Sequence, residues 1–374
     1  MKAHILSMVG LAAAMLTAQP AAAAGLLDCP LRDAPFSVQS PLVDILLSEA
    51  AKAAVDRHFP GAIAKIPPFF ASTEAPTFAA IVTIEKVGPL FGLPGGPALA
   101  ALDADLRAIE VTQADKVARC ARYDDDRPAF DLPKAKLKVL LFDKMTGFRD
   151  TPSVEAAETA LKAMAERKGW ALAVTDKGGA MHPSVLRRFD VVVWNNISGD
   201  VLTLSQRKAF RDYVEGGGGF VGIHGSAGDP VYFWDWYPDT LIGARFTGHP
   251  MDPQFQDAKV RIEVNPTGIG EGLAPGWTMN DEWYSFAVSP RATGANIVAT
   301  LDETSYAPGS FLPGGPSIAM GADHPIAWTR QVGKGRSFYS AIGHRPEVYA
   351  DARHLTLLEQ AILWAGTRPG RKAK

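Results

Sequence analysis

Residues 216–227 have the sequence GGGGFVGIHGSA, which combines a glycine-rich helix end, a short apolar strand over 219–223 and a tight turn at His224. In an open α/β sheet, such a turn lies at the carboxyl edge of the strands, where these folds bind ligands. A nucleophile elbow requires serine or cysteine at the apex. Here the apex is histidine and Ser226 comes two positions later. The stretch therefore predicts a polar site without a covalent acyl-enzyme.

The chain around this stretch alternates apolar strands with helices. Short runs rich in Val, Leu and Ala predict strands over 137–142, 171–175, 190–195 and 219–223. Helices are expected to begin at Thr151, which precedes a proline, and at Thr203, which opens a capping box. This alternation predicts an α/β fold with a mostly parallel, doubly wound sheet of the flavodoxin type. The glycines of 216–219 precede a strand, so they are not a dinucleotide or P-loop fingerprint.

The C-terminal part of the chain is expected to extend the same sheet. Four further strands are predicted over 260–264, 296–301, 326–330 and 337–340, and a closing helix over 353–365. The whole chain then divides into a signal peptide, a small helical module, a polar linker and the α/β domain, over 1–24, 35–112, 113–136 and 137–368.

The first 24 residues have the order of a secretory signal. Lys2 gives a positive start, residues 5–16 an apolar run, and residues 22–24 a small-residue cleavage site. A retained anchor is the alternative, but the run is too short to span a bilayer. Asp28 stands where a lipidated cysteine would need a small residue. We therefore expect cleavage near Ala24 and a periplasmic or secreted protein.

The expected export places the two cysteines in an oxidising compartment. In an oxidising compartment, Cys29 and Cys120 are expected to form a disulfide, with two unrelated buried thiols as the alternative.

Composition excludes some partners. The 374 residues are 47% hydrophobic and 21% charged, with a net charge of −2, as in ordinary soluble globular proteins. No global field favours nucleic acid or anionic membranes, so neither partner is expected after signal cleavage.

Three of the expected strands end in polar loops that contain glycine. The loops carry Asp143, Lys144, Thr146, Gly147 and Arg149; Asn195, Asn196, Ser198, Gly199 and Asp200; and His224, Gly225 and Ser226. In a parallel sheet these loops share one edge, so we expect one cleft. Ordinary turn chemistry is the alternative for residues 196–200.

The histidines are the second feature of the sequence that indicates a functional site. Of eight in the chain, five adjoin glycine or proline in the α/β region: His182, His224, His249, His324 and His344. None has the short spacing of a structural zinc site, so the metal ligands remain unknown. A divalent metal stays open, because histidine and carboxylate ligands suit zinc or manganese. We expect His182 and His324 to be structural and His224 to be functional.

Two short segments rich in aromatic residues are candidates for a sugar-binding site. Residues 281–284, DEWY, join two carboxylates to two aromatic rings. Such a string can bind sugar hydroxyls and an apolar sugar face, or it can be a half-buried strand with capping acids. Residues 234–237, WDWY, could wall the same cleft, with core packing as the alternative.

These residues together resemble the ThuA-like (trehalose-utilisation) family from about Lys138 to Gly366. The matching segments are 147–149, 196–200, 217–224, 243–250, 281–284, 324–328, 335–336 and 343–344. The resemblance implies a class I glutamine amidotransferase-like fold without the amidotransferase cysteine. It also implies carbohydrate metabolism, including trehalose and 3-keto-sugar pathways. The family often has Phe-Arg-His after the first strand, where this chain has Asp150.

We therefore expect an enzyme acting on a disaccharide or 3-keto sugar by acid–base chemistry, as a hydrolase or lyase. The expected catalytic residues are His224, Glu282 and Asp281. The expected substrate contacts are Arg149, Asn196, Asp200, Ser226, Arg245, His249, Trp283, Tyr284 and His344. A non-catalytic carbohydrate-binding or scaffold protein is the alternative, favoured by Asp150. Residues 35–41 are also similar to small helical modules of secreted bacterial hydrolases, which assigns no activity.

Overall fold

The computed structural model describes residues 26–311 and 315–367. The expected signal peptide over 1–24 lies outside the described residues. Within the described part of the chain, no helix combines the length and apolarity needed to cross a bilayer.

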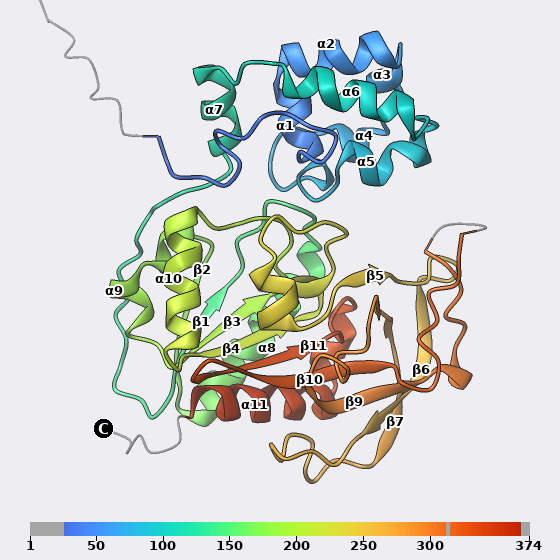
Figure 1. The fold of residues 1–374 in the computed structure, drawn as a ribbon. Coiled ribbons are helices and arrows are strands. Elements are labelled where there is room, and N and C mark those ends of the chain that lie inside the picture. The colour runs from blue at the N-terminus through green and yellow to red at the C-terminus, as the bar shows by residue number, and fades with distance from the viewer. Residues whose placement is uncertain (1–25, 312–314, 368–374) are drawn as a thin grey trace, which may run out of the picture.

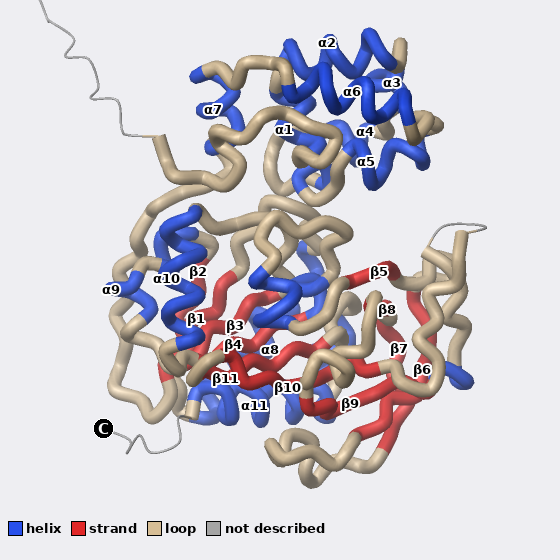
Figure 2. Tube along the Cα trace, in the orientation of Figure 1, coloured by secondary structure: helices blue, strands red, loops and turns tan. Residues whose placement is uncertain are grey.

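The α/β domain is built on one nine-stranded sheet (Figures 1 and 2). Its order is β2-β1-β3-β4-β11-β10-β9-β6-β7. The bounds are β1 Lys138–Phe142, β2 Ala171–Thr175, β3 Val191–Asn195, β4 Gly219–Ile223, β6 Phe255–Ile262, β7 Gly276–Glu282, β9 Asn296–Asp302, β10 Pro325–Val332 and β11 Gly335–Ser340. The last four expected strands do extend the same sheet. A separate pair joins β5, Phe246–Gly248, to β8, Ser285–Phe286.

Strand direction decides where the loops meet. The strands β2, β1, β3, β4 and β11 pair in parallel, whereas β10, β9, β6 and β7 continue the sheet by antiparallel pairs. Successive reversals leave β9 and β7 pointing the same way as β11, so only β10 and β6 oppose the rest of this sheet. The predicted mostly parallel α/β fold is confirmed.

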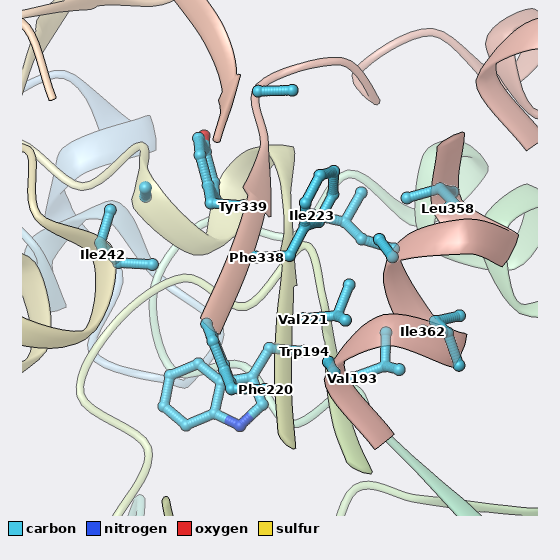
Figure 3. Packing of buried hydrophobic residues seen from close by; sticks show 14 of the residues in the cluster. Val193, Trp194, Phe220, Val221, Ile223, Ile242, Phe338, Tyr339, Leu358 and Ile362 are labelled. Carbon is cyan, nitrogen blue, oxygen red and sulfur yellow. The ribbon is translucent and has the colours of Figure 1, made fainter. Parts of the chain in front are cut away.

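Alternating side chains on the central strands explain the layers. Val221 and Ile223 of β4 lie on one face with Ile362 of α11, and Phe220 lies on the other (Figure 3). That second face receives α10, because the Phe210 ring packs 5.9 Å from Phe220. The helices of the α/β domain are α8 Thr151–Lys168, α9 Pro183–Leu186, α10 Leu204–Glu215 and α11 Ala352–Gly366.

A small helical module with its own core precedes this domain. Its helices are α1 Leu42–Leu47, α2 Glu49–His58, α3 Ala62–Lys65, α4 Pro68–Ala71, α5 Ile84–Val87 and α6 Pro97–Arg107. A further helix, α7 Gln113–Cys120, occupies the first part of the predicted linker, because Thr112 and Asp115 form a capping box. The expected Cys29–Cys120 disulfide is confirmed.

The module touches the domain beside the strand ends. The backbone N–H of Thr77 donates to the Thr146 carbonyl at 3.0 Å, and the rings of Phe78 and Phe148 lie 4.9 Å apart. The loop after β1 is therefore held between the two units.

Candidate functional site

Three strands that point the same way bring one cluster of polar side chains together. His224 directly follows β4, Glu282 is the last residue of β7, and His344 lies in the loop after β11. The side chains of His224 and Glu282 are buried, whereas His344 is 16% exposed and opens the cluster to solvent. We refer to these three residues as the His–Glu–His cluster.

The donor atoms of this cluster form a triangle. Nε2 of His224 lies 3.3 Å from Oε2 of Glu282 and 3.3 Å from Nδ1 of His344. That Nδ1 lies 3.0 Å from the same Glu282 oxygen. Among the described residues, these three offer one ligand atom each within 4.8 Å of one another, which is the arrangement that could hold a metal ion.

His224 is held in an uncommon backbone conformation. Its φ of 36° is positive, a region that non-glycine residues seldom adopt and that often marks functional sites. The Tyr339 hydroxyl donates to its carbonyl at 2.7 Å, and its own Nδ1 pairs with the Ala341 carbonyl at 2.7 Å. The Tyr284 ring lies 4.1 Å from the imidazole. These contacts fix the ring so that Nε2 faces Glu282.

The loop after β11 is held by Asp281. Its carboxylate accepts the backbone N–H groups of Gly343 at 2.7 Å and Arg345 at 2.9 Å. Burial raises the pKa of Asp281, although nearby His224 and these N–H groups oppose the change. Asp281 is fully buried, and both of its oxygens are bonded to the loop that carries His344.

Glu282 has partners on both carboxylate oxygens. Oε1 accepts a hydrogen bond from Gln254 and lies 3.2 Å from Nδ1 of His249. Burial alone would raise the pKa of Glu282, but hydrogen bonds from His224 and His344 hold it well below its usual value. This carboxylate is therefore an anion in the folded protein.

Asp150 lies behind His344. Its Oδ2 faces the other imidazole nitrogen of His344 at 3.5 Å and accepts a hydrogen bond from Ser153. Burial would lower the pKa of His344, but the hydrogen bond to Glu282 and the charges of Glu282 and Asp150 raise it. Asp150 thus orients one member of the cluster.

The predicted convergence of three polar loops is confirmed by backbone contacts. Thr146 donates its N–H to the Ser198 carbonyl at 3.1 Å, and Gly225 donates its N–H to the Asn196 side chain at 3.2 Å. Of the expected substrate contacts, the structure places His249, Tyr284, His344 and Asn196 in or beside the cluster. Arg149 is half-buried next to Asp150, with its guanidinium on the Asp143 carbonyl.

Four expected substrate contacts have other partners. The Trp283 ring is fully buried and its Nε1 donates to the Gln256 carbonyl, so it offers no platform to a sugar. Ser226 donates to the Trp194 carbonyl.

Arg245 forms ion pairs with Asp235 and Asp239 near the surface. Asp200 pairs with Arg207 and accepts the Tyr123 hydroxyl. These two charges are therefore satisfied within the protein.

The histidines expected to be structural have fixed partners. His324 is fully buried between Glu303, at 2.7 Å, and the Tyr284 carbonyl, at 2.9 Å. His182 caps α9 by accepting the Ser184 N–H.

The second aromatic string walls a different cavity. Trp234 and Tyr237 stack near Trp194 and line a space of about 30 Å³ beside Asp229. That volume suits about one water molecule. None of the cluster residues lines it.

Sequence reasoning missed Gln254, Ser153 and Phe255. The Phe255 ring lies 5.1 Å from the His344 ring, and Phe255 is 38% exposed. Each reaches the site through a contact with Glu282 or His344, far along the chain, so only the folded chain identifies them.

Comparisons with known proteins agree with this architecture. The family model described as ThuA, trehalose utilisation, matches residues 138–365. A ThuA-like protein from Bacteroides uniformis is 24% identical with a TM-score of 0.53, over 64% of this chain and 95% of that one. A ThuA-like protein from Parabacteroides merdae is 17% identical with a TM-score of 0.44, over 64% and 93%. No curated protein matches the chain with significance.

The family match spans more than half of the chain and includes the strand ends that carry His224, Glu282 and His344. The protein therefore belongs to the ThuA (trehalose utilisation) family.

Proposed function

We propose that this protein is an exported enzyme that acts on a disaccharide or an oxidised (3-keto) sugar, with the His–Glu–His cluster as its acid–base centre. The observation that carries the proposal is the convergence of two imidazoles and one carboxylate at the carboxyl ends of β4, β7 and β11. Ligands of open α/β folds bind at this edge.

The cluster supplies the groups that proton transfer needs. Nε2 of His224 faces the cluster while Nδ1 is occupied by the Ala341 carbonyl, so a proton can be exchanged at one defined atom. Glu282 is anionic and adjoins both imidazoles. A ketone at C3 of a sugar acidifies the neighbouring C–H group, and a fixed base beside it can remove that proton.

A carbohydrate substrate is supported by the family and by the rim of the site. The family is described by trehalose utilisation. Phe255 presents a partly exposed ring beside His344, and the half-buried Phe148 lies on the module side of the same imidazole. Aromatic rings suit the apolar faces of sugars, whereas carboxylates and imidazoles suit their hydroxyl groups.

Export is supported by the disulfide, since such bonds persist in oxidising compartments. Cys29 and Cys120 are also the only cysteines in the sequence, so no thiol remains for amidotransferase chemistry.

A non-catalytic carbohydrate-binding protein is the second candidate. Asp150 favours it, because it stands beside His344 where the resemblance leads us to expect a histidine. In that case the cleft would bind sugar without converting it.

The test is turnover by the purified mature protein. Trehalose, other disaccharides and their 3-keto forms are incubated with the wild type and with His224→Ala and Glu282→Gln. Loss of a general acid–base group typically lowers the rate about 100- to 10,000-fold, and we expect that loss with little change in melting temperature. His58→Ala is the control, because His58 pairs with Asp105 on the distant module surface.

Sugar binding by calorimetry without turnover would favour the second candidate. Unchanged activity in both cluster variants would show that the chemistry lies elsewhere.

A further inference from the structure

The His–Glu–His cluster has too many acceptors for its protons. The Nδ1 of His224 is committed to the Ala341 carbonyl as a donor, which leaves a lone pair on Nε2 of the neutral ring. In the tautomer that directs Nε2–H of His344 at the Asp150 carboxylate, 3.5 Å away, Nδ1 carries a lone pair as well. These two lone pairs and the Glu282 oxygen then face one another. In these tautomers the triangle is a set of three acceptors for one added cation, whereas the Nδ1–H tautomer of His344 would instead donate to Glu282.

The size of the triangle suits a metal ion. Its sides are 3.0, 3.3 and 3.3 Å. Nitrogen and oxygen ligands bound at about 2.0–2.2 Å, with angles near 90–110°, lie about 2.8–3.6 Å apart. The observed separations fall in that interval, so a single ion can contact all three atoms with little movement of the side chains.

The surroundings also resemble those of a metal site. Metal-binding histidines usually direct their other nitrogen at a carbonyl or a carboxylate, which fixes the tautomer and the ring. His224 does so with Ala341, and His344 does so with Asp150. The second oxygen of Glu282 is held by Gln254.

We propose that Nε2 of His224, Nδ1 of His344 and the Glu282 carboxylate bind one divalent transition-metal ion, such as Zn²⁺ or Mn²⁺. Two histidines and one carboxylate leave coordination positions for water or substrate. His344 is the ligand nearest solvent. This role rests on the proposed function: a bound ion would polarise a carbonyl or hydroxyl oxygen of the sugar.

The experiment uses the mature full-length protein, stripped with a chelator and then titrated with ZnCl2 or MnCl2 by calorimetry. We expect one ion per chain, a higher melting temperature on binding, and no comparable binding of CaCl2, because imidazole ligands disfavour calcium. Co²⁺ bound to the wild type should give a visible absorption spectrum typical of nitrogen and oxygen ligands, a readout that needs no variant.

Variants locate the site. His344→Ala and Glu282→Gln should abolish stoichiometric binding, whereas His58→Ala should bind as the wild type does. Asp150→Asn should weaken binding about 10- to 100-fold without changing the melting temperature of the metal-free protein, because Asp150 acts as a positioning residue.

Absence of stoichiometric binding to the wild type would overturn the metal site and leave protons as the cations of the cluster. Equal binding by the wild type and both ligand variants would overturn it as well. Stoichiometric binding without sugar turnover would support the metal site while counting against the proposed function.

Discussion

At the scale of single residues, close packing holds His224 in place. Gly343 passes directly over it: a Cβ added there would lie 2.9 Å from Cβ of His224 and 2.6 Å from the Tyr349 hydroxyl. Contacts under 3.0 Å force a neighbour to move, and φ of Gly343 is also positive, at 150°. Only glycine lets the β11 loop come this close.

Gly343→Ala should therefore displace His224. We expect a loss of about 1–3 kcal/mol in the free energy of unfolding, together with weaker activity. Gly294→Ala is the matched control, because Gly294 has φ of 88° but no atom within 4 Å of its added Cβ. Denaturant unfolding of both variants separates backbone strain from collision. Equal losses in both would mean that the contact with His224 is unimportant.

Asp229 is a buried carboxyl outside the cluster. Its oxygens accept hydrogen bonds from Ser198 at 2.6 Å and from the Gly199 N–H at 2.7 Å. Burial raises its pKa to about 7 despite these two bonds. The folded protein therefore holds a proton that the unfolded chain releases near pH 4.

A carboxyl whose pKa is raised on folding stabilises the protein fully below its unfolded pKa, and that contribution is lost as pH rises through the folded pKa. For Asp229 the loss should amount to about 1.4 kcal/mol per pH unit between about pH 4 and 7. Asp229→Asn should remove it, so this variant should gain stability relative to the wild type from pH 5 to pH 8. Parallel stability curves for the two proteins over that interval would contradict this assignment.

At the scale of elements, consecutive residues of β7 and of the turn that follows it have different structural roles. Asp281 holds the β11 loop, Glu282 faces the cluster, Trp283 fills the core and Tyr284 packs on His224. Successive side chains of a strand point to opposite faces, which accounts for the division between Asp281 and Glu282.

Asp281→Asn should loosen the β11 loop while retaining the fold. An amide oxygen can replace one of the two acceptors, but its NH₂ group opposes the other backbone N–H. We expect activity to fall at least tenfold, with a smaller change in melting temperature. Hydrogen exchange of residues 343–345 should rise with it. Unchanged exchange in this loop would show that Asp281 does not position His344.

The sequence predicts the parallel part of the sheet better than the antiparallel part. Strands β1, β3 and β4 are buried on both faces, so continuous apolar runs identify them within a residue. Strand β6 begins at Phe255, earlier than the expected 260, because its exposed face alternates with small or polar buried residues such as Gln256 and Ala258.

The site was predictable only in part, for a related reason. His224 and the Asp281–Glu282 pair stand out through turn position and composition. Their union with His344 depends on the folded sheet: β7 lies at its far edge in strand order, yet Glu282 at the end of β7 returns to within 3.3 Å of His224. The spacing of these residues along the chain does not predict that contact.

At the scale of the whole molecule, the disulfide lies where the module meets the α/β domain. Cys29 and Cys120 are 91 residues apart and buried, and they join the segment before the module to the end of α7. Asp28, next to Cys29, accepts the Leu204 and Ser205 N–H groups at the start of α10. One covalent bond thus restrains both units.

Removing this bond should lower the free energy of unfolding by about 4.6 kcal/mol, the value that loop entropy gives for a closed loop of this length. The measurement compares denaturant unfolding of the oxidised protein, the reduced protein and the Cys29→Ser/Cys120→Ser variant. Reductant should destabilise the wild type and leave the variant unchanged, which controls for effects of the reductant itself. Hydrogen exchange should rise first in α7 and around Asp28, because those segments lose their tether. Equal stability of the oxidised and reduced wild type would mean that the noncovalent contacts between the two units hold them together without the disulfide.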